Sequence, residues 1–183
     1  MSLIALAVII STDFAYEDAL YDYSVETLIP NIQQRMPSEG AQKAWLLFTD
    51  ASYYLVLPSI PIITLFIIIP QRARCIYYCF AYFLSITIGF TLKAAHHGPR
   101  PFWHPGTEVQ GFNCSTQYGN PSGHTLTSFS CLLLPWLDYC TNFNKADSVL
   151  AKPLAKIALL ILALTWGCLI AFSRMYLGVH SLD

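Results

Sequence analysis

The sequence Pro121-Ser122-Gly123-His124 stands directly before an apolar run, Leu126 to Leu137, and predicts the start of a helix. The proline cannot donate a backbone hydrogen bond, the serine is a favourable N-cap, and the glycine lets a ligand approach the backbone. The N–H groups and dipole of such a start favour an anion, most naturally a phosphate, and the neighbouring imidazole is suited to proton transfer. A capped helix without a catalytic role is the simpler interpretation.

The overall composition indicates a lipid environment. Of 183 residues, 55% are hydrophobic and only 11% are charged, whereas a soluble domain has about 25% charged residues. The net charge of -1 argues against a nucleic-acid partner. Without an internal repeat or a linker between soluble domains, the chain is expected to form a single domain, 1–183.

Four stretches are long and apolar enough for membrane helices, which need roughly 20 such residues. They cover residues of about 45–69, 75–95, 122–139 and 154–172. Pro58 and Pro61 lie inside the first stretch and predict a kink, which neighbouring helices tolerate in a bilayer. We therefore expect an all-α fold, a polytopic membrane helical bundle.

The N-terminal 40 residues differ from this bundle. Residues 3–10 are apolar but short, which favours a segment at the membrane interface, with a cleaved signal peptide as the alternative. Residues 11–40 are acidic and are interrupted by Pro30 and Pro37. We expect residues 1–40 to form an acidic surface segment with one or two short helices.

Four membrane helices would place the loop 96–120 and the segment 173–183 on one side of the membrane. Basic residues in the linkers 71–74 and 141–153 mark the opposite side as cytoplasmic. The loop then faces the lumen or the exterior, and in a eukaryotic cell we expect the membrane of the endoplasmic reticulum. A glycosylation sequon at Asn113 agrees with that side.

The cysteines do not indicate a disulfide framework. Of six cysteines, only Cys114 falls in a polar loop, and the others lie in or at the ends of apolar runs. We expect free thiols.

A basic cluster lies at the end of the second predicted helix. Lys93 and Arg100 flank Gly98-Pro99, a sequence that ends a helix and turns the chain. Two cations in this arrangement can hold one dianion. Either cation alone would more often extend its side chain to lipid headgroups.

A second basic cluster follows the fourth predicted helix. Arg174 and His180 are six residues apart, and in an unbroken helix that spacing would point their side chains in different directions. A bend at Gly178 would let both face one ligand, because glycine adopts backbone conformations that other residues avoid.

Together the clusters form a motif in three parts. Lys93 to Pro101 reads Lys-x6-Arg-Pro, Pro121 to His124 reads Pro-Ser-Gly-His, and Ser173 to His180 reads Ser-Arg-x5-His. This motif resembles the type 2 phosphatidic acid phosphatase family, which shares a superfamily with vanadium haloperoxidases and glucose-6-phosphatases. The sequence at 100–103 is similar to the glucose-6-phosphatase branch and that at 176–181 to sphingosine-phosphate phosphatases, so the branch stays open.

The resemblance implies a role for each motif residue. His180 would be the nucleophile that forms a phosphohistidine, and His124 the acid that protonates the leaving oxygen and then activates water. The residues implied in phosphate binding are Lys93, Arg100, Ser122, Gly123 and Arg174. Fixed cations and N–H donors stabilise the charge that spreads over the phosphoryl oxygens during transfer. The resemblance implies no metal and no other cofactor.

The resemblance is incomplete at the C-terminal end. The family motif continues His-x3-Asp, which would place the carboxylate one residue beyond Asp183. We expect Asp183 or another acceptor to orient His180. We also expect the bundle to lack the family's final membrane helix.

The sequence therefore predicts an integral membrane phosphatase that hydrolyses a phosphate ester or pyrophosphate of a lipid or small sugar. It would be a metal-independent phosphoric monoester or diphosphate hydrolase, with a phosphorylated lipid or sugar phosphate as substrate and membrane lipids as partners. The alternative is a catalytically inactive membrane protein that binds a phosphorylated lipid or a partner without turnover. A transporter is disfavoured because no pair of broken helices recurs in two halves.

Overall fold

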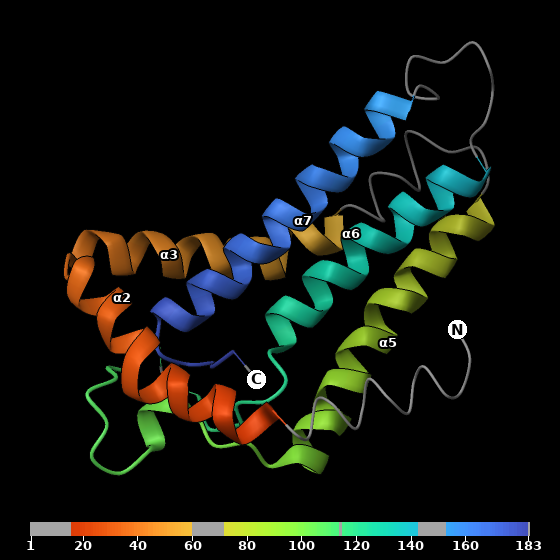
Figure 1. Cartoon of the computed structure of the whole chain (residues 1–183). Helices are drawn as coiled ribbons and strands as arrows, with labels where there is room; N and C mark the ends of the chain where they lie inside the picture. Colours follow the sequence, from red (N-terminus) through yellow and green to blue (C-terminus); the bar gives the residue numbers. More distant parts are fainter. Residues whose placement is uncertain (1–15, 60–71, 114, 143–152, 183) are drawn as a thin grey trace. The chain divides into compact units, whose positions relative to one another are not determined.

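The computed structural model describes residues 16–59, 72–113, 115–142 and 153–182. Within these ranges the chain forms helices joined by turns and loops, with no strand, which confirms the predicted all-α fold (Figure 1). Some predictions concern residues outside these ranges, namely 3–10, 60–69, Gln71, most of the predicted linker 141–153, Cys114 and Asp183.

The chain divides into two compact units. The first consists of Met1–Leu46, Leu92–Pro121 and Ser173–Asp183, and the second of Leu47–Thr91 and Ser122–Phe172. The first unit therefore contains both basic clusters, and the second contains the helix start at Ser122.

Three apolar helices agree closely with their predicted positions. Helix α5 covers Arg72–His96, α6 covers Gly123–Asn142 and α7 covers Pro153–Tyr176. Helix α7 extends one turn further than expected, so Ser173 and Arg174 lie within the helix and not after it. Helix α6 contains Pro135, which removes one backbone hydrogen bond from the helix interior.

Two prolines are accommodated by short π-helices. η1 (Ser24–Leu28) ends two residues before Pro30, and η2 (Ser52–Val56) ends two residues before Pro58. In both, the next residue donates its N–H to the carbonyl five residues back. A proline ring collides with the carbonyl four residues back in a regular α-helix, and the wider π-turn relieves that collision.

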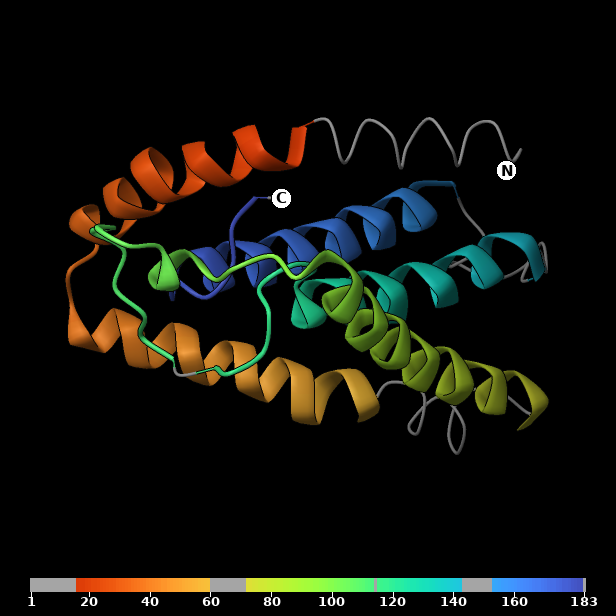
Figure 2. The same ribbon diagram turned by 90° about the horizontal axis from the view of Figure 1, so that it is seen from below.

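Residues 16–35 consequently form one helical run, as Figure 2 shows, and Pro30 belongs to this run. The expected interruption at Pro30 is therefore wrong, because Pro30 is the second residue of α2 (Ile29–Arg35), which directly follows the π-helix. The interruption at Pro37 is confirmed, since this residue separates α2 from α3 (Glu39–Ala51).

The first unit is held together by a small apolar core and a buried glutamine. The core consists of Val25, Ile29 and Val109, with Tyr21, Phe102 and Met175 packed against it. Gln33 donates from its amide to the carbonyls of Gln110 at 2.8 Å and Tyr176 at 2.9 Å, and its Oε1 accepts the Gln110 N–H at 3.0 Å. The Gln33 side chain thereby joins α2, the polar loop 96–120 and the end of α7.

In the second unit, α6 and α7 lie side by side and antiparallel (Figures 1 and 2). The Trp136 indole on α6 donates to the Lys156 carbonyl on α7 at 2.9 Å. Gly167 lies under the Phe129 ring, where an added Cβ would come within 2.5 Å of a ring carbon. The two helices can therefore approach closely only because this position has no side chain.

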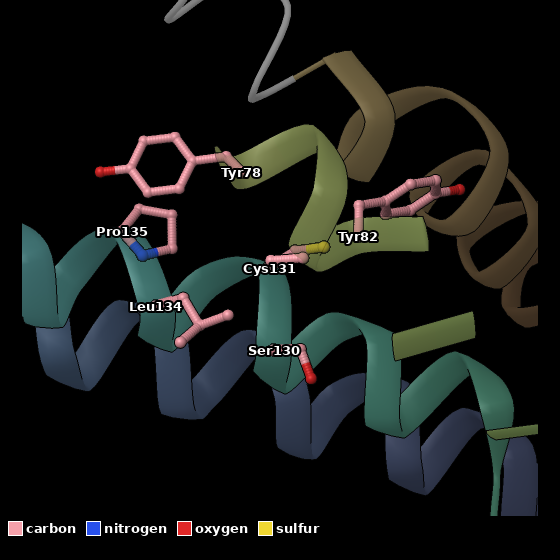
Figure 3. Close-up of a pocket in the computed structure, with 7 residues that line it drawn as sticks. Tyr78, Tyr82, Ser130, Cys131, Leu134 and Pro135 are labelled. Atoms are coloured by element: carbon pink, nitrogen blue, oxygen red, sulfur yellow. The ribbon is translucent and has the colours of Figure 1, made fainter. Parts of the chain in front are cut away.

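Helices α5 and α6 enclose a cavity of about 10 Å³ beside Pro135 (Figure 3). Tyr78 and Tyr82 of α5 and Cys131 of α6 line it, and the Tyr78 hydroxyl donates to the Asp138 carboxylate on α6. Pro135 has no N–H to give to the Cys131 carbonyl, and a cavity of this volume is about the size of one water molecule.

Two helical stretches are long and apolar enough to cross a membrane, Ile76–Trp103 and Pro153–Tyr176. Their most apolar residues are mostly exposed, with only 22% and 17% of them buried, respectively. This exposure of apolar side chains indicates membrane association. Among the described helices, α6 and the run 39–59 do not meet the same criterion, so their predicted crossing stays a prediction.

The free thiols are confirmed for Cys79, Cys131, Cys140 and Cys168.

Candidate active site

Lys93 lies in the last turn of α5 and is only 8% exposed. Its Nζ donates to the Tyr118 carbonyl at 2.7 Å and to the Gly119 carbonyl at 3.4 Å. The side chain is therefore directed into the first unit, and the alternative of a lysine extended towards lipid headgroups does not describe it.

Arg100 joins the two basic clusters and is 2% exposed. Its Nε donates to the Gln117 carbonyl at 2.6 Å, and one terminal nitrogen donates to the Tyr118 carbonyl at 3.4 Å. The other terminal nitrogen donates to the Val179 carbonyl at 2.7 Å. The guanidinium thus connects the loop residues Gln117 and Tyr118 to Val179, the residue directly before His180.

The bend predicted at Gly178 is present and forms a helix C-cap. Gly178 has a φ of 71°. Its N–H bonds to the Met175 carbonyl at 2.8 Å, and the Val179 N–H bonds to the Arg174 carbonyl at 3.2 Å. These two bonds and the positive φ are the features of a Schellman motif, in which glycine is the usual residue.

The close approach of the polar loop also requires Gly178. A Cβ at this position would lie 2.3 Å from the Gln110 carbonyl oxygen, so no side chain fits. The turn carries His180, which is 4% exposed, and follows Arg174, which is 3% exposed. Both proposed site residues of this cluster are therefore buried in the structure.

Electrostatically, the first unit concentrates positive charge. The charges of Arg100 and Arg174 both act on Lys93, and all three side chains are nearly excluded from solvent. Repulsion between like charges is strong where water cannot screen it. An arrangement of this kind is stabilised by an anion, and a doubly charged phosphate is the natural candidate.

Gly98 and Gly119 let the loop after α5 fold back on itself, so that its later residues contact the segment between Lys93 and Arg100. The Gly119 N–H donates to the Gly98 carbonyl at 2.7 Å. A Cβ on Gly119 would lie 2.7 Å from the Pro99 carbonyl oxygen. This backbone contact brings the carbonyls of residues 117–119 to Lys93 and Arg100.

Glu17 supports the same loop from the N-terminal helical run. Its carboxylate accepts a hydrogen bond from the Asn120 amide at 3.0 Å and lies 3.4 Å from His96 Nδ1. Sequence reasoning missed Glu17, Gln33 and the loop carbonyls, because nothing in their local sequence distinguishes them from surface residues. Only Asn120, the partner of Glu17, had a sequence signal, because it directly precedes the Pro-Ser-Gly-His stretch.

In the second unit, Ser122 is the N-cap of α6, as predicted. Its Oγ accepts the Thr125 N–H at 3.4 Å and the Thr125 hydroxyl at 3.0 Å, and its carbonyl accepts the Leu126 N–H at 2.9 Å. Gly123 is the first residue of the helix. Its N–H is one of the groups for which an α-helix offers no internal acceptor.

His124 lies in the first turn of α6 against two tyrosines of η2. The centroid of its ring is 4.2 Å from that of Tyr53, with an angle of 31° between the planes. The Tyr54 ring meets it edge-on at 6.4 Å. The imidazole is therefore held in an aromatic setting within the second unit.

The structure brings together Lys93, Arg100, Arg174 and His180 in the first unit, and Ser122, Gly123 and His124 in the second. Asp183 lies outside the described residues. Among the described residues, no three His, Cys, Asp or Glu side chains gather in a way that could hold a metal ion.

A model of one protein family, the PAP2 superfamily, matches residues 74–183. This range contains all three parts of the motif. Comparison with curated proteins and with solved structures finds no match.

Proposed function

The chain belongs to the PAP2 superfamily, and on this premise we propose that it is an integral membrane phosphatase acting through a phosphohistidine. Membership indicates phosphatase-type activity on a phosphorylated substrate. The observation that carries the finer proposal is the buried cluster of Lys93, Arg100 and Arg174 in the unit that also contains His180. Buried cations beside an imidazole suit the capture and transfer of a phosphoryl group.

The proposed reaction has two steps. In the first, an imidazole nitrogen of His180 attacks phosphorus and the bond to the leaving oxygen breaks, while His124 gives its proton to that oxygen. In the second, water attacks the phosphohistidine, His124 takes a proton from the water, and the phosphorus–nitrogen bond breaks. Inorganic phosphate leaves, and both histidines return to their starting states.

The remaining motif residues would bind the phosphoryl oxygens. Lys93, Arg100 and Arg174 supply positive charge, and Ser122 and the Gly123 N–H supply hydrogen bonds. Although Lys93 and Arg100 already donate to carbonyls, an ammonium has three donors and a guanidinium five, so each keeps capacity for a phosphate. Asp183 is the proposed partner that orients His180.

The proposed substrate is a phosphate ester or pyrophosphate of a lipid or small sugar, with the glucose-6-phosphatase and sphingosine-phosphate phosphatase branches as the two alternatives. Apolar exposed faces on α5 and α7 support a membrane setting. We place the site on the lumenal or exterior face, and on the endoplasmic reticulum in a eukaryotic cell. No metal is required by the proposed steps.

The test is a phosphate-release assay on the full chain in detergent, with phosphatidate, sphingosine phosphate, a prenyl diphosphate and glucose 6-phosphate. We expect hydrolysis of at least one substrate, unaffected by EDTA and abolished by His180→Ala. His104→Ala is the matched control, because His104 is an exposed loop histidine. Substrate binding without release of phosphate would favour the inactive alternative, and activity that survives His180→Ala would refute the mechanism.

A further inference from the structure

The imidazole of His124 has two aromatic neighbours, which meet it in different ways. Tyr53 packs against the imidazole with centroids 4.2 Å apart and planes 31° from parallel, which is a tilted stack. Tyr54 meets the same imidazole at 6.4 Å and 88°, by an edge. Both tyrosines and His124 belong to the second unit.

The two tyrosines differ in how far they are exposed. Tyr53 is half-buried. Tyr54, in contrast, is 65% exposed. Of the two neighbours, Tyr53 is therefore the one more restrained by packing.

The π-helix explains why consecutive tyrosines reach one histidine. In an α-helix, neighbouring side chains are rotated by about 100°, and the hydrogen bonds of a π-helix, which span five residues, widen the turn and reduce that rotation. Pro58 follows this π-helix at the spacing that Pro30 has after η1. The local backbone is thus set by the proline, and π-bulges are frequent at functional sites.

We propose that Tyr53 is a positioning residue for His124. This inference rests on the proposed function, in which His124 must carry a proton at the moment when the leaving oxygen departs. The face of a tyrosine ring attracts a cation, so the stack favours the imidazolium and also fixes the plane in which it donates.

Turnover provides the first test, with the full chain and whichever substrate it hydrolyses. Removing the ring with Tyr53→Leu or Tyr53→Met should lower kcat at least about fivefold and leave KM nearly unchanged, because His124 acts on bound substrate. Tyr53→Phe keeps the stack and should restore most of kcat. Tyr54→Leu is the matched control and should retain turnover within about twofold.

Nuclear magnetic resonance of histidine-labelled protein provides a readout that does not depend on catalysis. The ring current of Tyr53 should shift the carbon-bound protons of His124 upfield. This shift should disappear in Tyr53→Leu or Tyr53→Met, whichever variant folds, and persist in Tyr53→Phe and Tyr54→Leu.

The two readouts separate the possible failures. No turnover by the wild-type chain would overturn the proposed function and the catalytic part of this inference, while the spectrum would still show whether Tyr53 holds the ring. Normal kcat after the ring-current shift is lost would overturn the positioning role alone. An unchanged His124 spectrum in Tyr53→Leu would overturn the contact itself.

Discussion

The guanidinium of Arg100 donates a hydrogen bond to the carbonyl of Val179 at 2.7 Å. This bond connects the loop that follows α5 to the turn that carries His180, although the two residues are 79 positions apart. The same guanidinium holds the carbonyls of Gln117 and Tyr118. Arg100 therefore organises the cluster in addition to its proposed contact with phosphate.

Arg100→Lys should lower kcat/KM by about tenfold to a hundredfold, since each hydrogen bond lost from a charged group costs about 1.5–3 kcal/mol. An ammonium is a point charge and cannot reach Gln117 and Val179 together as the planar guanidinium does. Phosphate release under identical conditions measures the effect. Arg35→Lys, at an exposed position, is the control and should leave kcat/KM unchanged. Equal activity of both variants would contradict the organising role.

Gly178→Ala should lower the free energy of unfolding by more than about 2 kcal/mol. The substitution imposes a positive φ on alanine and places its Cβ 2.3 Å from the Gln110 oxygen. Gly106→Ala separates the two causes, because Gly106 also has a positive φ but nothing lies within 4 Å of the added Cβ. That control should lose only about 1 kcal/mol. Denaturant titration of both variants in one detergent gives the comparison, and equal losses would show that the close approach to Gln110 is not tight.

Gln33→Glu should destabilise the first unit by about 2–3 kcal/mol. The amide donates to two carbonyls. A carboxylate oxygen in its place would face these two carbonyl oxygens without a proton to donate. Gln34→Glu makes the same chemical change at the next residue, which is exposed, and should have almost no effect. Thermal unfolding monitored by circular dichroism checks this pair. Similar melting temperatures for the two variants would mean that the Gln33 network is not needed.

Hydrophobicity and helix signals were enough to locate α5, α6 and α7 within a few residues. The cap at Ser122 and the bend at Gly178 were also predictable, because each depends on one residue and its immediate neighbours. The extension of α7 through Arg174 was missed, since a charged residue after an apolar run was interpreted as the end of the helix.

Features that no recognised local pattern specifies were not predictable from the sequence. Pro30 was expected to interrupt a helix, but the π-turn before it lets the helix continue. Gln33 was part of an apparent surface segment, yet its partners lie more than 70 residues away. The carbonyls that surround Lys93 and Arg100 belong to a loop whose backbone conformation no local pattern specifies.

The most direct test of the central claim is to identify the residue that becomes phosphorylated. His124→Ala, incubated with radiolabelled p-nitrophenyl phosphate and quenched rapidly, should accumulate a phosphoryl group on His180. The leaving group of this substrate needs no acid, whereas water attack on the intermediate needs the missing base. Peptide mass spectrometry that places the label on His180 would support the account. Label on another residue, or undiminished turnover by His180→Ala, would contradict it.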